Sequence, residues 1–374
     1  MVKDSALEKW IYRRHTQVKH EILADYLGRW VNILGTGHWR IYFIDGFAGR
    51  CEYLREENGT KVLAGSPLVG MEAAQALSRR HTVAEVICLF IESDPENFES
   101  LEQAIEMARK RYPWPTVRPL IRGEFANHAP LILQEIRNAG APSFWFIDPF
   151  GVKGVSFELV SEIMLVEKAE VFFTFMYEYL RRFIEETPNV ADALFGTNRW
   201  RKIVKIIPKG LQQEYALRDL YIEQLLAEGN TSYAFAFRMM ESDKRETKYY
   251  LIHATNHIKG LWEMREAMDR HGAPGTFAFV GPDELAFQGQ QLPYFSTDEQ
   301  NMEQLRNEIL SRFPPGYSTS FAKIRAKTWR IPCVRRHYKH ALLRLWREGK
   351  ISVQTIPPRQ FKGGFQEFDV INFL

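Results

Sequence analysis

The stretch Trp39–Gly49 (WRIYFIDGFAG) constrains the fold more than any other part of this chain. It begins with alternating and then continuous apolar and aromatic residues, a pattern that predicts a strand in a sheet covered on both faces. Asp45 ends the strand, and the glycine-bearing segment Gly46–Gly49 follows it. Glycines just past a strand allow a sharp turn and the close approach of a ligand. The pattern therefore indicates a site for a ligand with a cationic or hydroxyl group, with an ordinary strand and glycine turn as the competing interpretation.

Two further acids follow predicted strands. Glu85–Glu92 (EVICLFIE) is a second buried strand, and Glu92 at its end can accept hydrogen bonds from both hydroxyls of a ribose. Asp94 fits better as the cap of the next helix. Glu124 comes after a short third strand, Thr116–Arg122, where an acid can accept from an adenine amino group. A role as the N-cap of the following helix is the competing explanation for Glu124.

The loop after the first strand lacks the dinucleotide fingerprint G-x-G-x-x-G. An acid, a Phe and a Gly at this place are closer to the S-adenosylmethionine (SAM) loop of class I methyltransferases. We therefore expect SAM as the cofactor. The residues expected to bind it are Asp45, Gly46, Phe47, Ala48, Gly49, Glu92 and Glu124.

A fourth predicted strand, Ser143–Asp148, runs into Pro149, Phe150 and Gly151. A carboxylate here lies beside the loop of the first strand, at the switch point of a doubly wound sheet. Adenine amino-group methyltransferases carry Asp-Pro-Pro-Tyr at this place, where Asp and Pro hold the amine and the aromatic ring stacks on the base. We expect Asp148, Pro149 and Phe150 to take these catalytic roles. The aromatic residue comes one place early, and a turn-forming D-P-x-G is the alternative.

Strands and helices alternate through the first 280 residues, which predicts an α/β domain with a mostly parallel sheet. Seven strands fit a Rossmann-like class I methyltransferase sheet. The last three strands are expected at Glu170–Met176, Tyr249–Ala254 and Thr276–Val280, with an N-terminal helical segment at 1–35 and a helical insertion at 186–245.

Two segments near the glycine loop leave alternatives open. In the N-terminal helix, Lys19, His20 and Tyr26 either face the cofactor site or are solvated or half-buried. The polar insertion Arg50–Gly65 is long for a connection between a strand and a helix. It is interpreted either as a cover for the ligand or as a surface loop.

A basic section follows a linker predicted at residues 281–300. Residues 300–364 carry 14 Lys or Arg and 3 Asp or Glu, a local net charge of +11, whereas the whole chain has +3. Residues 301–374 predict three short helices and a β-hairpin, the pattern of a winged helix-turn-helix. Cations on its last helix and on its hairpin tip are expected to contact a nucleic-acid backbone, and a protein-docking winged helix is the alternative. These cations are Arg335, Arg336, Lys339, Arg359 and Lys362.

The three cysteines, Cys51, Cys88 and Cys333, lie far apart and form no C-x-x-C pair. This spacing argues against a disulfide framework and a typical zinc site, so no metal is expected. The N-terminus has no apolar signal core, and no apolar run approaches the length of a membrane span. We expect a cytoplasmic protein that makes no contact with a membrane.

Taken together, these motifs resemble the three-Cys-motif partner family over nearly the whole chain. The resemblance rests on KHEILADYL (19–27), YFIDGFAG (42–49), GSPL (65–68), FIESD (90–94), FIDPFGVKG (146–154), YYLIHATNHIKGLWEMREAM (249–268) and the C-terminal section. It implies a Rossmann-like methyltransferase fold and a companion protein encoded nearby that carries the cysteine motif. The three scattered cysteines of this chain are not that motif.

The leading hypothesis is a SAM-dependent methyltransferase that acts on an exocyclic amine of a nucleic-acid base, DNA in preference to RNA, together with the companion protein. Asp148 and the Pro149 carbonyl would orient the amine, which is a matter of positioning more than of strong base chemistry. A second hypothesis is a catalytically inactive scaffold that binds nucleic acid and recruits the companion. A third is a metal-dependent nuclease built on Asp45, Glu92 and Asp148.

Overall fold

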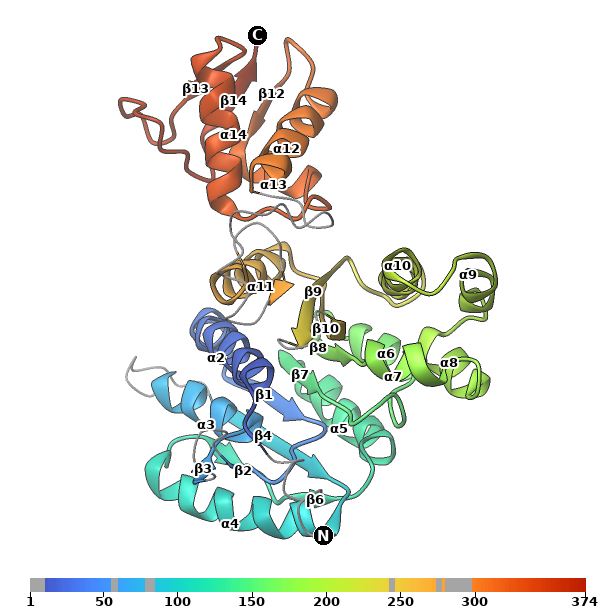
Figure 1. Cartoon of the computed structure of the whole chain (residues 1–374). Helices are drawn as coiled ribbons and strands as arrows, with labels where there is room; N and C mark the ends of the chain where they lie inside the picture. The colour runs from blue at the N-terminus through green and yellow to red at the C-terminus, as the bar shows by residue number, and fades with distance from the viewer. Residues whose placement is uncertain (1–10, 55–59, 78–84, 242–245, 274–277, 280–297) are drawn as a thin grey trace. The chain divides into compact units, whose positions relative to one another are not determined.

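The computed structural model describes residues 11–54, 60–77, 85–241, 246–273, 278–279 and 298–374. Figure 1 shows its helices and strands. The chain divides into two compact units, the first comprising Met1–Met264 and Phe279–Asp283, the second Arg265–Ala278 and Glu284–Leu374. Each unit has its own sheet, and the two are described separately.

The first unit has an α/β fold built on a mostly parallel sheet (Figure 1). Its strands are β1 (Arg40–Asp45), β4 (Glu85–Glu92), β5 (Thr116–Val117), β6 (Ile121–Arg122), β7 (Ser143–Ile147), β8 (Ala169–Phe175), β9 (Tyr233–Glu241), β10 (Glu246–Thr255) and β11 (Ala278–Phe279). Within the described residues the order is β11-β9-β10-β8-β7-β1-β4-β5, and β6 also pairs with β4. Six strands pair with one another in parallel, namely β1, β4, β5, β6, β7 and β8. Strand β10 is antiparallel to both β8 and β9.

Helices pack on both faces of this sheet, which is why its central strands are apolar throughout. The helices are α2 (Arg14–Leu34), α3 (Ser66–Leu77), α4 (Pro95–Arg111), α5 (Phe125–Ala139), α6 (Phe157–Met164), α7 (Tyr177–Phe183), α8 (Pro188–Phe195), α9 (Trp200–Ile206), α10 (Leu211–Ala227) and α11 (Ile258–His271). Tyr42 and Ile44 of β1 join the core formed with α5, α6, α8 and α10. On the other face, the ring of Phe43 lies against Gly70 of α3. The burial on both faces that the sequence of β1 predicts is confirmed.

Several predicted elements form as expected, and one does not. The second strand is Glu85–Glu92 as predicted, and Asp94 caps α4, because its side chain accepts from the backbone N–H groups of Glu96 and Asn97, both at 3.0 Å. The helical insertion predicted at 186–245 is wrong in part, since β9 occupies Tyr233–Glu241. This strand pairs with the next strand in the chain, β10, over nearly its whole length, and that pairing sets its conformation.

Other predicted segments change in detail. The third strand is split into β5 and β6, and β10 is longer than the predicted Tyr249–Ala254. Of the predicted strand at 276–280, residues 278–279 form β11 and the rest lies outside the described residues. The insertion Arg50–Gly65 contains an antiparallel hairpin of β2 (Glu52–Leu54) and β3 (Lys61–Leu63).

The second unit begins earlier than predicted. Arg265, in α11, is 1% exposed, and its Nη1 donates to the Ile331 carbonyl at 3.1 Å, so this end of α11 belongs to the second unit. The predicted linker lies almost entirely outside the described residues, and helix α12 begins at Asp298. The other elements are β12 (Ser318–Ser320), α13 (Phe321–Lys327), α14 (Arg335–Arg347), β13 (Ile351–Gln354) and β14 (Val370–Phe373), with an antiparallel sheet in the order β12-β14-β13.

None of the described helices combines the length and the apolar character that a membrane crossing requires.

Candidate functional site

Three of the predicted acids come together at one edge of the sheet. Strands β7, β1 and β4 are adjacent and parallel, and Asp45 is paired in register with Phe90 and with Phe146. Glu92 lies two residues after Phe90, and Asp148 lies two residues after Phe146. The three carboxylates therefore lie at the ends of neighbouring strands, on the same edge of the sheet. In an open parallel sheet, ligands bind at this carboxyl edge, where the strand order reverses.

The loop that follows β1 is fixed to both neighbouring strands. The N–H of Gly46 donates to the Phe146 carbonyl at 3.0 Å, and that of Ala48 donates to the Ile91 carbonyl at 2.9 Å. A Cβ atom on Gly46 would lie 2.6 Å from the ring of Phe125, so this position requires glycine for close packing. The loop is therefore held in one conformation across the ends of β7 and β4.

Asp45 is completely buried at the base of this loop. Burial raises the pKa of its carboxyl group to about 7, and the carboxylates of Asp148 and Glu92 add to the rise, against hydrogen bonding from Ser66 and the backbone of Phe47. Its Oδ1 accepts from the Phe47 N–H at 3.2 Å. Among the described residues its Oδ2 accepts no hydrogen bond of ordinary geometry. This oxygen is sealed from solvent, so its hydrogen-bonding capacity is left unmet within the described part of the chain.

Glu92 links the loop of β1 to the end of β4. Its Oε2 accepts from the N–H of Gly49 at 2.8 Å, and its Oε1 accepts from the N–H of Asp94 at 2.8 Å. Burial raises its pKa, and these backbone hydrogen bonds act against the rise. The backbone of Ser93 contributes a third hydrogen bond, so about one of the roughly four lone-pair sites of this carboxylate remains for a further donor.

Glu124 and Phe47 lie side by side near Gly154. A Cβ atom built on Gly154 would lie 3.8 Å from the ring of Phe47 and 3.9 Å from Oε2 of Glu124. Glu124 occupies the N-cap position of α5, as the competing explanation required, yet its exposed side chain makes no capping hydrogen bond. The ring of Phe47 packs 5.5 Å from that of Phe125, between centroids.

Asp148 has a partner that the sequence did not assign to it. Lys19 of α2 forms an ion pair with Oδ2 of Asp148, and the two side chains are 8% and 21% exposed. The Lys19 ammonium also lies 5.4 Å from the ring centroid of Tyr249. Pro149 is buried, whereas Phe150 is 75% exposed. The charge of Asp148 is therefore compensated by the Lys19 ammonium, which contacts Oδ2 and not Oδ1.

An aromatic cluster surrounds this ion pair, and sequence patterns missed most of it. The Tyr12 hydroxyl lies 3.0 Å from Nδ1 of His20, and the rings of Tyr12 and Tyr53 lie 5.0 Å apart. Burial lowers the pKa of His20 to about 3, with Lys19 adding to the effect, so its imidazole is neutral at neutral pH. Lys19 and His20 are both buried, so neither is solvated: Lys19 contacts Asp148, and His20 packs beside Tyr12 and Tyr53. The sequence feature that could have indicated this aromatic cluster is Tyr53, a partly buried aromatic residue in the otherwise polar insertion.

Tyr26, the third of these helical residues, has a different environment. Its hydroxyl donates to Glu170 at the start of β8, and its ring lies 5.4 Å from that of Phe144. It is therefore a core residue and not part of the edge that holds Asp45.

The five cations predicted to bind nucleic acid fall into two groups. Three of them form ion pairs inside the second unit: Arg335 with Glu367 at 3.2 Å, Arg336 with Asp269, and Arg359 with Asp369. For Lys339 and Lys362 the described residues contain no ion-pair partner. We therefore regard the two lysines as better placed for a phosphate backbone than the three arginines.

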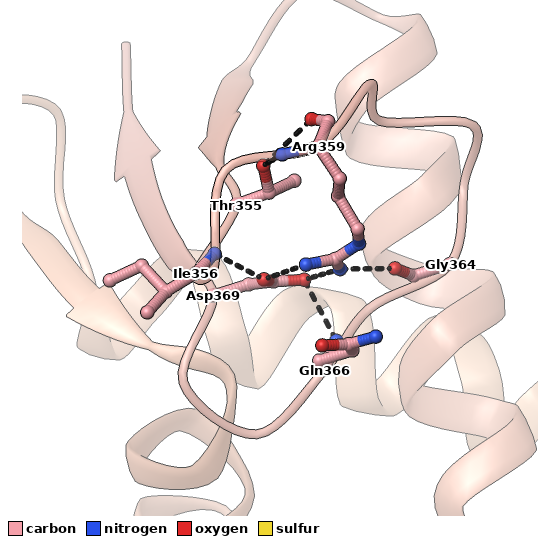
Figure 2. Close-up of polar contacts among 6 residues, drawn as sticks. All are labelled: Thr355, Ile356, Arg359, Gly364, Gln366 and Asp369. Carbon is pink, nitrogen blue, oxygen red and sulfur yellow. Dashed lines mark hydrogen bonds and ion pairs between the residues drawn. The ribbon is translucent and has the colours of Figure 1, made fainter.

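Arg359 requires a correction, because the structure gives it an internal role. Figure 2 shows its guanidinium between the carboxylate of Asp369 and the carbonyl of Gly364. Asp369 is fully buried and also accepts from the N–H groups of Ile356 at 3.0 Å and Gln366 at 2.8 Å. The loop from β13 to β14 is thus folded around the buried carboxylate of Asp369, and the half-buried Arg359 side chain stabilises the loop by pairing with it instead of projecting toward a ligand.

Within the described residues no group of three His, Cys, Asp or Glu side chains is arranged to hold a metal ion. Asp45, Glu92 and Asp148 end adjacent strands but do not form such a donor set.

No protein-family model matches this chain, and a search of the curated proteins gave no match either. Among solved structures, the chain is similar to protein LPL1258 from Legionella pneumophila str. Philadelphia 1, described as family-model DUF519. The TM-score is 0.35 at 11% sequence identity, over 64% of this chain and 84% of that chain. A TM-score this low does not establish a shared fold. The α/β assignment rests on the mostly parallel sheet and its helices.

Proposed function

We propose that this chain is a SAM-dependent methyltransferase that acts on an exocyclic amine of a nucleic-acid base. The observation that carries the proposal is the arrangement of Asp45, Glu92 and Asp148 at the ends of three adjacent parallel strands. The strand order supports it as well, since β10 returns antiparallel between β8 and β9, as the hairpin-like return of a class I methyltransferase sheet requires. The seven-strand Rossmann-like layout is part of the proposal.

The residues at the cofactor end fit the polar groups of SAM. Asp45 has an oxygen without a hydrogen bond, which suits the α-ammonium group, and the tethered loop from Gly46 to Gly49 brings backbone close to it. Glu92 keeps about one acceptor position for a ribose hydroxyl. Glu124 and Phe47 are close together and suit the amino group and the ring face of adenine. The cofactor supplies an electrophilic methyl group on its sulfonium.

The acceptor end follows from Asp148. Its Oδ1 accepts a hydrogen bond from the amine together with the Pro149 carbonyl, which aims the nitrogen lone pair toward the methyl group. Lys19 compensates the charge of Asp148 and fixes its orientation through Oδ2. Phe150 is 75% exposed beside it and offers a face on which an extruded base can stack.

The second unit supplies the nucleic-acid contact in this proposal. Three helices and the sheet β12-β14-β13 fit a winged helix-turn-helix, with α14 as the recognition helix. Lys339 on α14 and Lys362 in the loop before β14 would contact phosphates, DNA being favoured over RNA. The three-Cys-motif companion protein remains the proposed partner.

Two measurements on the full-length chain test the proposal. Calorimetry should give SAM binding that falls about tenfold or more in Asp45→Asn, because a charge-assisted hydrogen bond is lost. Asp94→Asn is the matched control, since Asn also caps a helix and this exposed residue should leave affinity unchanged. Methyl transfer from labelled SAM to oligonucleotides should be lost in Asp148→Ala. Absence of SAM binding by the folded wild-type chain would overturn the proposal, and undiminished turnover in Asp148→Ala would remove Asp148 from the mechanism.

Two observations favour a second candidate, the inactive scaffold. Oδ2 of Asp148 is engaged by Lys19, and the motif departs from Asp-Pro-Pro-Tyr. A scaffold would bind DNA with a steep salt dependence and show no turnover with any oligonucleotide. Turnover that depends on Asp148 decides against it.

A further inference from the structure

The first unit contains a cavity at the edge of the sheet opposite to the carboxylate site. Its volume is about 310 Å³, which places it at the small end of ligand pockets. The first residues of β8, Ala169 and Glu170, line it, and so does Thr255, the last residue of the antiparallel strand β10. Because Asp45 ends a strand parallel to β8 and Glu170 begins β8, the two sites lie at opposite ends of the strands.

A buried carboxylate forms the polar point of this cavity. Glu170 is 7% exposed, and its Oε2 is engaged by both the Tyr26 hydroxyl and Nε2 of His253, the latter at 2.8 Å. Among the described residues its Oε1 has no hydrogen-bond partner, and it is not one of the polar atoms sealed from solvent. Since Glu170 lines the cavity, Oε1 faces that space.

The walls beside Glu170 are largely aromatic and aliphatic. Tyr26 and Trp30 are 1% and 3% exposed and line the cavity together with Ile33 and Leu34 of the same helix. Aromatic faces next to a carboxylate favour an organic cation, through cation–π attraction and an ion pair. The exposed charges at the rim are Glu167, Lys168 and Lys259, while Glu263 is already paired with Arg29 at 2.6 Å.

Gly260 of α11 keeps the space next to the carboxylate open. A Cβ atom at this position would lie 3.0 Å from both carboxylate oxygens of Glu170 and 3.0 Å from the Thr255 hydroxyl. Any side chain here would press on Glu170 and fill the space that its Oε1 faces. The cavity thus combines a tight glycine, an open carboxylate oxygen and an aromatic wall.

We propose that this cavity binds a small primary amine with an apolar or aromatic body, the ammonium group donating to Oε1 of Glu170 and the body packing against Trp30 and Ile33. A buried carboxylate that receives hydrogen bonds only from a phenol and an imidazole gains most from a cation. This site is independent of the proposed methyltransferase function and needs neither SAM nor nucleic acid.

The test uses 2-phenylethylamine as the probe on the full-length chain, with 2-phenylethanol and 3-phenylpropanoate as neutral and anionic analogues. Calorimetry should show the amine binding about tenfold or more tightly than the alcohol, and the propanoate weakest. In Glu170→Gln the preference for the amine over the alcohol should disappear, because Gln keeps an acceptor for Tyr26 and His253 but carries no charge.

Two further variants keep the result interpretable. Glu167→Gln removes an exposed carboxylate at the same rim and should leave the preference unchanged. Ile33→Trp fills the cavity from a half-buried position and should abolish binding of both amine and alcohol without unfolding the chain, which circular dichroism verifies. No binding of the amine by the wild-type chain, or an unchanged preference in Glu170→Gln, would overturn the proposal.

Discussion

The buried carboxyl group of Asp45 should make the stability of this protein depend on pH in a direction opposite to that of an ordinary Asp. Its pKa is raised to about 7, chiefly by burial, from the ordinary Asp value of 3.8. The folded protein therefore binds this proton more tightly than the unfolded chain does. The resulting stability is fully present below about pH 4 and is lost as the pH rises through about 7.

The size of the effect follows from the two pKa values. A rise of about three units corresponds to about 4 kcal/mol over the full range, of which about 2.5 kcal/mol falls between pH 5 and pH 8. His20 works in the other direction, because burial lowers its pKa to about 3 and the stability linked to it is lost as the pH falls below about 6.5. A total pH profile mixes the two effects, so Asp45 must be isolated by a variant.

Asp45→Asn provides that isolation, since the amide does not titrate. Urea unfolding of both proteins at pH 5 and pH 8 gives four free energies of unfolding. Between these pH values the wild-type chain should lose about 2.5 kcal/mol relative to Asp45→Asn. Profiles that run parallel would refute the argument, because Asp45 would then titrate as an exposed carboxyl group does.

The same pKa predicts a proton release if a cationic ligand group binds at Asp45. At pH 6.5 an acid of pKa 7 is about three-quarters protonated, and an adjacent ammonium group lowers its pKa. SAM binding at this pH should therefore release about 0.7 proton. Calorimetry in two buffers of different ionisation enthalpy measures this number, and a value near zero would separate Asp45 from the ammonium group.

The remaining predictions concern the ion pairs and the glycine loop. Lys19→Met should destabilise the first unit by about 2 kcal/mol, because it leaves the partly buried charge of Asp148 without its partner. In a double-mutant cycle, adding Asp148→Asn to Lys19→Met should restore most of this lost stability. Simple additivity of the two single effects would disprove the coupling. Under the proposed DNA-binding role, Arg359→Met should lower the melting temperature of the second unit without changing the salt dependence of binding. Lys362→Met should reduce the salt slope by about one and leave melting unchanged. The opposite pattern would restore Arg359 as a phosphate contact. Gly46→Ala should weaken SAM binding and lower the stability of the first unit, because the added Cβ atom would lie 2.6 Å from the Phe125 ring. An unchanged affinity by calorimetry together with an unchanged melting temperature would show that the loop can move.

Much of the fold was accessible from sequence because its signals are local. The apolar runs of β1, β4, β7 and β8 identify buried strands of a parallel sheet, and an acidic residue at the ends of β1, β4 and β7 marks where these three strands stop. The cap at Asp94 is equally local, since its acceptor and donors lie within three residues. Strand β9 was missed because its conformation depends on pairing with the next strand, β10, which the residues of β9 alone do not show.

The sequence by itself determined which acids end the strands, and therefore that Asp45, Glu92 and Asp148 would share one edge, because parallel strands place their ends together. Tertiary structure decided what those acids and the predicted cations contact. Lys19 meets Asp148 across 129 residues of sequence, and Arg359 turns inward to Asp369. The physical reason is that a strand pattern repeats every two residues and is visible locally, whereas an ion pair depends on which distant segments the packing brings within a few ångströms.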